Sequence, residues 1–187
     1  MKTLFINACT RKESRTLTLS NYLLDKIKGE KEIINLYDLD LKPFTEEMID
    51  FRHKCIMEDD FDNSMFDLAK KFVSADLIVI GAPTWDLSFP SILKLFIEHI
   101  NVVELTFEYG PWGDIIPKCR ANRLIYVTTS GGPVNEEQSF GYIKALSDTF
   151  FGIKKLDFIK AEYLDEENSN VDEILARAKK DIDKLVI

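Results

Sequence analysis

The sequence is short of the residues that define several common classes of protein. It has only three cysteines in 187 residues, and their wide spacing forms neither a disulfide framework nor a Cys-x-x-Cys pair. Lys and Arg total 24 against 32 Asp and Glu, a net charge of -8 that argues against nucleic acid and anionic membranes as partners. No apolar run approaches the ~20 residues of a transmembrane helix, and the first residues do not form a signal peptide. We therefore expect a cytoplasmic protein with reduced thiols.

Glycine and histidine are also scarce where common cofactor motifs need them. None of the eight glycines falls in residues 9–16, so this loop is neither a Walker loop nor a G-x-G-x-x-G turn. It also lacks the acidic pair of a response-regulator receiver domain. His53 and His99 are far apart in the chain, and the acidic run 58–62 lacks calcium-loop spacing. We expect this run to begin the next helix, and we predict no metal site.

Apolar runs of strand length alternate with helical patterns along the whole chain. The predicted strands cover residues 2–8, 32–36, 76–80, 124–128 and 156–162, and the predicted helices cover 16–28, 46–54, 65–72, 91–103, 135–151 and 171–185. Residues 105–118 are predicted to be an irregular insertion, and Gly152 is a candidate helix cap. This alternation predicts one α/β domain over residues 1–187, a doubly wound parallel sheet of order 2-1-3-4-5 with helices on both faces.

In this fold ligands bind at the carboxyl ends of the strands, so the loops after residues 8, 80 and 128 are the first candidates. The first of these loops runs directly into a helix, whose N-terminus carries free N–H groups and partial positive charge. Its hydroxyls and cations suit a phosphate group: Thr10, Arg11, Lys12, Ser14, Arg15 and Thr16. Alternatively, it is a solvated loop in which Ser14 or Thr16 caps the helix.

The other two loops are suited to a flat ring. Pro83 and Pro90 stiffen the second loop, and the large apolar Trp85 and Leu87 lie between them. An aromatic ligand explains these side chains, although Trp85 alternatively covers the end of the sheet. The third loop, residues 128–133, combines hydroxyls with two glycines that let a ligand approach the backbone. Its alternative is an ordinary strand-to-helix turn.

The same stretches resemble a known family, the flavodoxin-like NAD(P)H-dependent oxidoreductases that include FMN-dependent azoreductases and quinone reductases. Residues 82–86 with 90–94 and Glu98 resemble its flavin-ring loop and the helix that follows. Residues 128–132 resemble the azoreductase T-S-R-G-G motif, and residues 105–110 with Gly113 resemble the T-F-x-Y insertion. The resemblance covers essentially the whole chain in order and spacing.

The resemblance implies a tightly bound FMN and NADH or NADPH as co-substrate. Ser14, Arg15 and Thr16 would hold the phosphate, the backbone of 84–87 would line the N5 and O4 edge, and 129–132 would line the pyrimidine side. The full set of implied cofactor-binding residues is Thr10, Ser14, Arg15, Thr16, Pro83, Thr84, Trp85, Asp86, Leu87, Thr129, Ser130, Gly131 and Gly132. Such enzymes are typically homodimers with the active site at the interface, and Tyr109, Trp112 and Phe151 are candidates to wall the substrate pocket.

The implied reaction passes two electrons from the nicotinamide to a quinone, an azo compound or a similar small acceptor. A ping-pong mechanism follows if both substrates share one site, and no side chain need act as a nucleophile. The main alternative is a flavodoxin-type electron carrier without its own NAD(P)H reaction, although the phosphate loop of a carrier is normally shorter and contains glycine. A flavin-free interaction protein is a further alternative.

Two residues depart from the family pattern. Ser130 replaces the arginine of the T-S-R-G-G motif, which leaves one fewer charge near the flavin. Asp86 stands where an uncharged residue is common. A carboxylate ~5 Å from a reduced, anionic flavin would cost roughly 3 kcal/mol at an effective dielectric of about 20, which would either lower the flavin potential or raise the pKa of Asp86. If Asp86 points to solvent, the effect is small.

Overall fold

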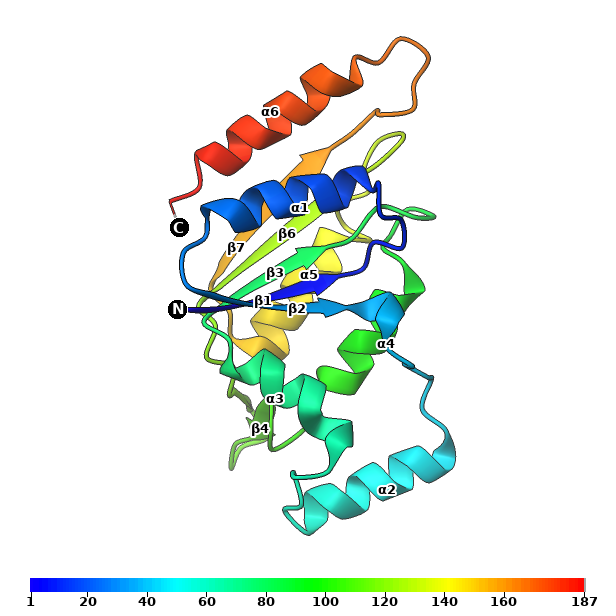
Figure 1. Cartoon of the computed structure of the whole chain (residues 1–187). Helices are drawn as coiled ribbons and strands as arrows, with labels where there is room; N and C mark the ends of the chain where they lie inside the picture. Colours follow the sequence, from blue (N-terminus) through cyan, green and yellow to red (C-terminus); the bar gives the residue numbers. More distant parts are fainter. Residues whose placement is uncertain (187) are drawn as a thin grey trace.

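The computed structural model describes residues 1–186, and its main feature is a five-stranded parallel sheet in the order β2-β1-β3-β6-β7 (Figure 1). The strands are β1 (Lys2–Asn7), β2 (Glu30–Asn35), β3 (Leu77–Gly81), β6 (Arg123–Thr129) and β7 (Lys155–Ala161). With the two short hairpin strands set aside, this order is the predicted 2-1-3-4-5. The predicted fold class is therefore confirmed.

The two strands at the centre of the order, β3 and β6, are buried along their full length. Residues 77–80 of β3 and 124–127 of β6 are continuous apolar runs rather than alternating ones, as expected where helices cover both faces of a parallel sheet. Parallel pairing aligns Ile6 with Ile80 and Ile80 with Tyr126, so the three strands end at nearly the same level. The loops that follow β1, β3 and β6 are thereby neighbours.

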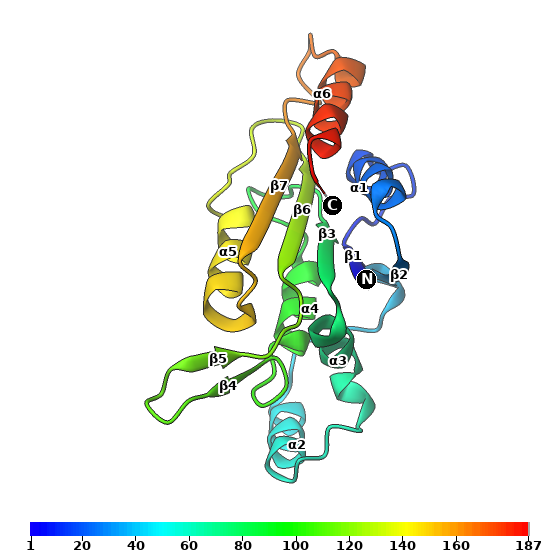
Figure 2. The same cartoon turned by 90° about the vertical axis from the view of Figure 1, so that its left-hand side faces the viewer.

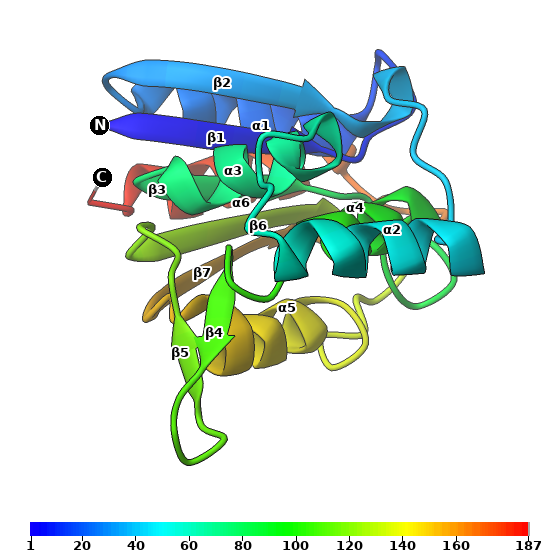
Figure 3. The same ribbon diagram turned by 90° about the horizontal axis from the view of Figure 1, so that it is seen from below.

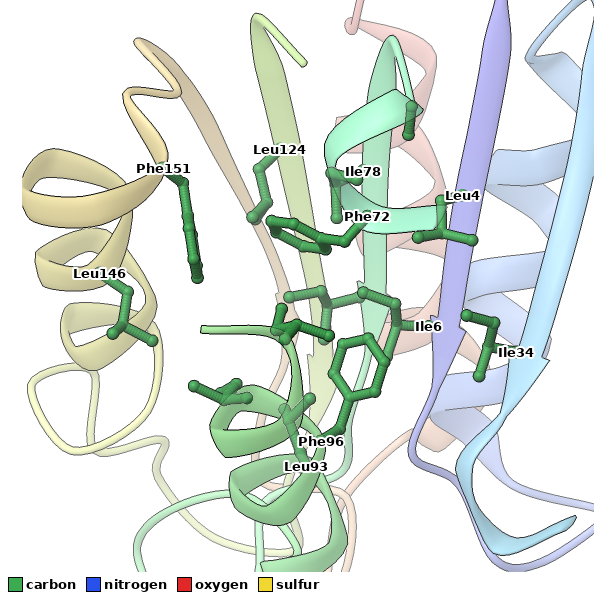
Figure 4. Close-up of a cluster of buried hydrophobic side chains, with 14 of the residues drawn as sticks. Leu4, Ile6, Ile34, Phe72, Ile78, Leu93, Phe96, Leu124, Leu146 and Phe151 are labelled. Carbon is green, nitrogen blue, oxygen red and sulfur yellow. The ribbon is translucent and has the colours of Figure 1, made fainter. Parts of the chain in front are cut away.

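Helices cover both faces of the sheet (Figure 2). On one face lie α1 (Arg15–Lys26) and α6 (Val171–Asp183), whose apolar residues include Leu19, Leu23 and Ile182. On the other lie α3 (Asp67–Ser74), α4 (Ser91–Ile100) and α5 (Phe140–Leu146). Figure 4 shows the core beneath this second group, where Phe72 and Phe96 pack with residues of the strands. Two separate cores thus hold the sheet rigid.

Helix α5 differs from its prediction at both ends. It begins at Phe140 rather than 135, because the Glu136 carbonyl accepts from the Gly141 amide at 2.7 Å and closes a separate turn first. Its last turn is a π-helix, Ser147–Phe151. Gly152 then takes a left-handed φ of 66° and donates its N–H to the Ser147 carbonyl at 2.7 Å. The predicted cap at Gly152 is confirmed.

The predicted irregular insertion is in fact an antiparallel hairpin of β4 (Phe107–Tyr109) and β5 (Ile115–Pro117). Phe107 is buried and anchors it, and the Gly110 amide closes the turn on the Asp114 carbonyl at 2.7 Å. The chain passes from β5 to the start of β6, so the hairpin lies at the amino-terminal end of the sheet and extends past α5 (Figure 3).

Helix α2 (Glu46–Met57) lies between β2 and α3 in the chain and extends away from the sheet in Figures 1 and 2. It is three residues longer than predicted. The acidic run 58–62 follows its C-terminus instead of beginning the next helix, since Glu58 is the C-cap and Asp59 has a φ of 55°. Over residues 1–186, no helix combines the length and apolar character that crossing a membrane requires.

Candidate functional site

A cavity of about 430 Å³ lies at the carboxyl ends of β1, β3 and β6, where the fold places ligands. Loops after all three strands contribute to its wall, and so does the loop after β7. Nine residues predicted to bind a cofactor meet here: Thr10, Ser14, Arg15, Pro83, Thr84, Trp85, Thr129, Ser130 and Gly131. Its size falls within the range of about 300–1,000 Å³ typical of small-molecule sites.

The first loop presents the N-terminus of α1 to this cavity. Ser14 is the N-cap, and its Oγ accepts from the Leu17 amide at 3.3 Å. The amides of Arg15 and Thr16 occupy the first two helical positions, where no carbonyl within the helix can accept from them. Ser14 is therefore both a helix cap and a residue of the cavity wall, so the capping and phosphate-binding interpretations of this loop are compatible.

Two pairs of threonine hydroxyls join the loops around the cavity. The Oγ1 atoms of Thr16 and Thr129 lie 2.6 Å apart, and both residues are buried. The Oγ1 atoms of Thr84 and Thr128 lie 3.1 Å apart. Thr16 is fully buried and does not line the cavity. Its hydroxyl instead fixes α1 to the end of β6.

The second loop ends in a strained turn. The Thr84 amide donates to the Thr129 carbonyl at 2.9 Å, which aligns the loop with the end of β6. Trp85 and Ser88 then exchange two backbone hydrogen bonds of 2.9 Å around Asp86 and Leu87, whose φ angles are 47° and 69°. Two successive positive φ angles define a type I′ turn, which Asp tolerates and Leu adopts only with strain.

The two central residues of this turn lie outside the cavity wall. Asp86 and Leu87 are exposed and do not line the cavity, whereas Trp85, 44% exposed, forms part of the wall. Strained backbone of this kind tends to cluster at functional sites. Because Asp86 is exposed to solvent, we expect its charge to have little effect on a ring bound in the cavity.

The third loop packs against the segment after β7, which sequence reasoning did not include. The Ser130 amide donates to the Ala161 carbonyl at 2.9 Å, and the Gly132 carbonyl accepts from the Tyr163 amide at 3.1 Å. Gly132 itself lies outside the cavity wall. Arg11, a candidate phosphate-binding cation from the sequence, also lines the cavity, whereas Glu13, Leu164 and Asp165 were not singled out from the sequence.

Arg15 is already paired within the protein. Its Nη1 lies 2.7 Å from Asp165 Oδ1, an ion pair that crosses from the start of α1 to the loop after β7. The two side chains are 42% and 69% exposed, so solvent reaches this contact. Arg15, which was predicted to bind a phosphate group, is thus already paired with the carboxylate of Asp165.

Cys9 is the first residue of the first loop, but its thiol is not a reactive one. The residue is buried, its Sγ contacts the Gly81 carbonyl at 3.7 Å, and burial raises the pKa of the thiol. A raised pKa reduces the thiolate form that acts as a nucleophile. The site therefore offers binding groups and a stacking surface rather than a covalent catalyst.

The three predicted substrate-pocket residues are not brought to this cavity within the chain. Tyr109 and Trp112 belong to the hairpin at the opposite end of the sheet, where they are 61% and 94% exposed. Phe151 is a core residue whose ring packs 4.8 Å from that of Phe72 (Figure 4). The aromatic side chain of Phe151 fills the core under α5, so it does not line the cavity within one chain.

Comparison with known proteins gives matches over nearly the whole chain. A family model described as a flavodoxin-like fold matches residues 1–186. The FMN-dependent NADH:quinone oxidoreductase of Clostridium beijerinckii is 34% identical over 187 residues, covering 95% of this chain and 93% of that protein. The FMN-dependent NADH:quinone oxidoreductase 2 of Clostridium acetobutylicum is 33% identical over 187 residues, with 93% and 92% covered.

Solved structures agree on the fold. An azoreductase from Bacillus anthracis superimposes with a TM-score of 0.84 at 20% identity, covering 98% of this chain and 97% of that one. A Bacillus anthracis FMN-dependent NADH-azoreductase in complex with FMN gives 0.80 at 24% identity, with 98% and 97% covered. These two likenesses concern the arrangement of the backbone.

Proposed function

The chain belongs to the flavodoxin-like family that includes these clostridial quinone oxidoreductases, and from this premise we propose that it is an FMN-dependent NAD(P)H oxidoreductase. Its acceptors are quinones, azo compounds or similar small molecules. The observation that carries the proposal is the meeting of three loops, distant in sequence, in one cavity at the carboxyl ends of the strands. Each of these loops contributes residues that suit one part of FMN.

The residues present fit this cofactor. The hydroxyls of Thr10 and Ser14, the Arg15 guanidinium and the free amides at the start of α1 form a donor set for the phosphate. Residues 83–85 offer a stiff backbone and an aromatic side chain to one part of the ring, and residues 129–131 offer hydroxyls and a glycine backbone to another. No lining residue is a cysteine or a histidine.

The protein groups bind and orient, and the cofactor carries the reaction. FMN, when bound, supplies two-electron transfer between a nicotinamide and an acceptor. The Thr16–Thr129 and Thr84–Thr128 hydroxyl pairs keep the three loops in register, so that the donors at both ends of the cavity hold fixed positions. We propose ping-pong kinetics, with nicotinamide and acceptor using the same open side of the cavity in turn.

We further propose that residues 1–187 act as one domain in a cytoplasmic homodimer. The large exposed aromatics support association: Trp112 is 94% exposed, Tyr109 is 61% exposed, and Trp85 is 44% exposed at the cavity. Exposed apolar side chains of this size favour contact with another surface. In such a dimer, Tyr109 and Trp112 of one copy would wall the cavity of the other.

The visible spectrum of the purified protein tests the proposal. We expect a flavin spectrum, directly or after incubation with FMN, that bleaches on anaerobic mixing with NADH or NADPH and recovers when a benzoquinone or an azo dye is added. A flavin that stays oxidised with both nicotinamides would identify an electron carrier instead. A protein that takes up no FMN would refute both assignments.

A further inference from the structure

The ion pair between Arg15 and Asp165 gives the phosphate end of the cavity an unexpected charge balance. Four charged side chains line the wall, and two are basic (Arg11 and Arg15) while two are acidic (Glu13 and Asp165). Their formal charges cancel. A site that binds a phosphate dianion gains affinity from cations, so the two carboxylates need an explanation.

Asp165 is held in this position by the backbone. Its amide donates to the Gly131 carbonyl at 3.1 Å, and the neighbouring Leu164 amide donates to the Ser130 carbonyl at 3.1 Å. An ideal Cβ on Gly131 would lie 2.5 Å from Asp165 Oδ2, so the carboxylate packs directly against the third loop of the site. These backbone hydrogen bonds and the contact with Gly131 place the carboxylate at the cavity wall, beside the third loop.

Arg15 has few other contacts. Besides the 2.7 Å contact with Asp165, its Nη1 has a long hydrogen bond of 3.5 Å to the Leu164 carbonyl. Because the pair is partly exposed, its net energy is that of a surface ion pair and an incoming anion can break it. A phosphate group at the start of α1 and the Asp165 carboxylate are then alternative partners for one guanidinium.

We propose that Asp165 competes with the phosphate group of FMN for Arg15 and thereby limits how tightly this protein holds its cofactor and how strongly it prefers FMN over flavins without phosphate. This inference rests on the proposed function, since it concerns FMN in the same cavity. It assigns to Asp165 a role in cofactor affinity and none in electron transfer.

The test measures binding of FMN and of riboflavin, which lacks the phosphate, to flavin-free protein by quenching of flavin fluorescence. The variants are Asp165→Asn, Arg15→Met and the double variant, with Asp165→Ser as a second replacement in case the amide disturbs folding. Glu173→Gln is the matched control, because it removes the carboxylate of another exposed arginine pair, Arg177–Glu173 on α6.

We expect Asp165→Asn to bind FMN about three- to fivefold more tightly than the wild type, the gain expected when a surface ion pair no longer has to be broken. Riboflavin affinity stays unchanged, as does FMN affinity in Glu173→Gln. In the Arg15→Met background, the Asp165 substitution no longer changes FMN affinity, because the shared partner is gone.

Several results would overturn the proposal. Unchanged or weaker FMN binding by both Asp165 variants would show that the carboxylate orients Arg15 instead of competing for it. An equal gain for riboflavin would show that the phosphate is not involved, and a gain that persists without Arg15 would indicate direct repulsion. If the wild type and every variant fail to bind FMN, the proposed function itself is refuted, and this inference with it.

Discussion

The buried hydroxyl pair of Thr16 and Thr129 allows a quantitative prediction, because the two residues differ in their access to water. Replacing either with valine keeps the shape of the side chain and leaves the other hydroxyl without its partner. An unsatisfied buried hydroxyl costs about 1–3 kcal/mol. Thr129→Val strands the hydroxyl of Thr16, which is 0% exposed, so we expect a loss of about 2–3 kcal/mol.

Thr16→Val instead strands the hydroxyl of Thr129, which is 8% exposed and lines the cavity, where water can reach it. The expected loss is about 1 kcal/mol. The double variant removes both polar groups together and should lose less than the sum of the two single variants, because replacing both partners by apolar groups is nearly neutral. The coupling between the two sites should be about 2–3 kcal/mol.

Urea unfolding of the flavin-free protein, followed by circular dichroism, measures the free energies of unfolding for the cycle. Thr18→Val is the control, because its hydroxyl bonds to the Ser14 carbonyl at 3.1 Å in an exposed position. We expect that variant to lie within about 0.5 kcal/mol of the wild type. Additive losses of stability, or a larger loss for Thr16→Val than for Thr129→Val, would refute the assignment of this pair as a buried hydrogen bond between α1 and β6.

Three further predictions follow from single positions. Asp86→Asn should shift the flavin midpoint potential by less than about 20 mV in a redox titration, since the carboxylate is exposed and screened by salt; a larger shift would place it near the ring. Gly152→Ala should lower the free energy of unfolding by about 2 kcal/mol, because φ is 66° and the added Cβ would lie 2.7 Å from Pro117 Cβ; a loss below about 0.5 kcal/mol would contradict this. Lys71 and Lys2 hold the pKa of Glu32 below its usual 4.5. The ionised carboxylate therefore stabilises the fold above pH 4.5, and this contribution is lost as the pH falls through the depressed pKa. As the pH is lowered below 4.5, the urea midpoint of Glu32→Gln should therefore fall less steeply than that of the wild type. An equal fall in both proteins would refute a stabilising role for the ion pairs of Glu32.

The sheet could be predicted from the sequence because the deciding signals are local. A continuous apolar run such as β3 has few alternatives to a buried parallel strand, and the stripe along α6 has a clear helical period. The hairpin was missed because β4 and β5 have only three residues each and no Asn-Gly turn between them. The π-helical end of α5 adds one residue to a turn, which a 3.6-residue pattern does not reveal.

The candidate site was predictable only as far as strand order determines it. The rule that ligands lie at the carboxyl ends of the central strands identified three loops, and the structure brings them together. The same rule gave no reason to examine the loop after β7, an edge strand, so Leu164 and Asp165 were missed. Asp165 lies 150 residues from Arg15, and only the folded chain reveals their contact. Whether Thr16 faces the cavity or the core depends on the rotation of α1, which residue type does not determine.

The position of the hairpin follows from the direction of the chain and decides what its aromatic residues can do. In a βαβ unit the strand leads to the carboxyl edge of the sheet and the helix returns the chain to the amino edge. An insertion between α4 and β6 must therefore emerge at the amino edge, away from the cavity at the carboxyl edge of its own chain. Tyr109 and Trp112 can reach such a cavity only on a second copy of the protein. Their proposed role in acceptor binding therefore requires the proposed dimer, whereas the proposed cofactor binding by the three loops requires one chain alone.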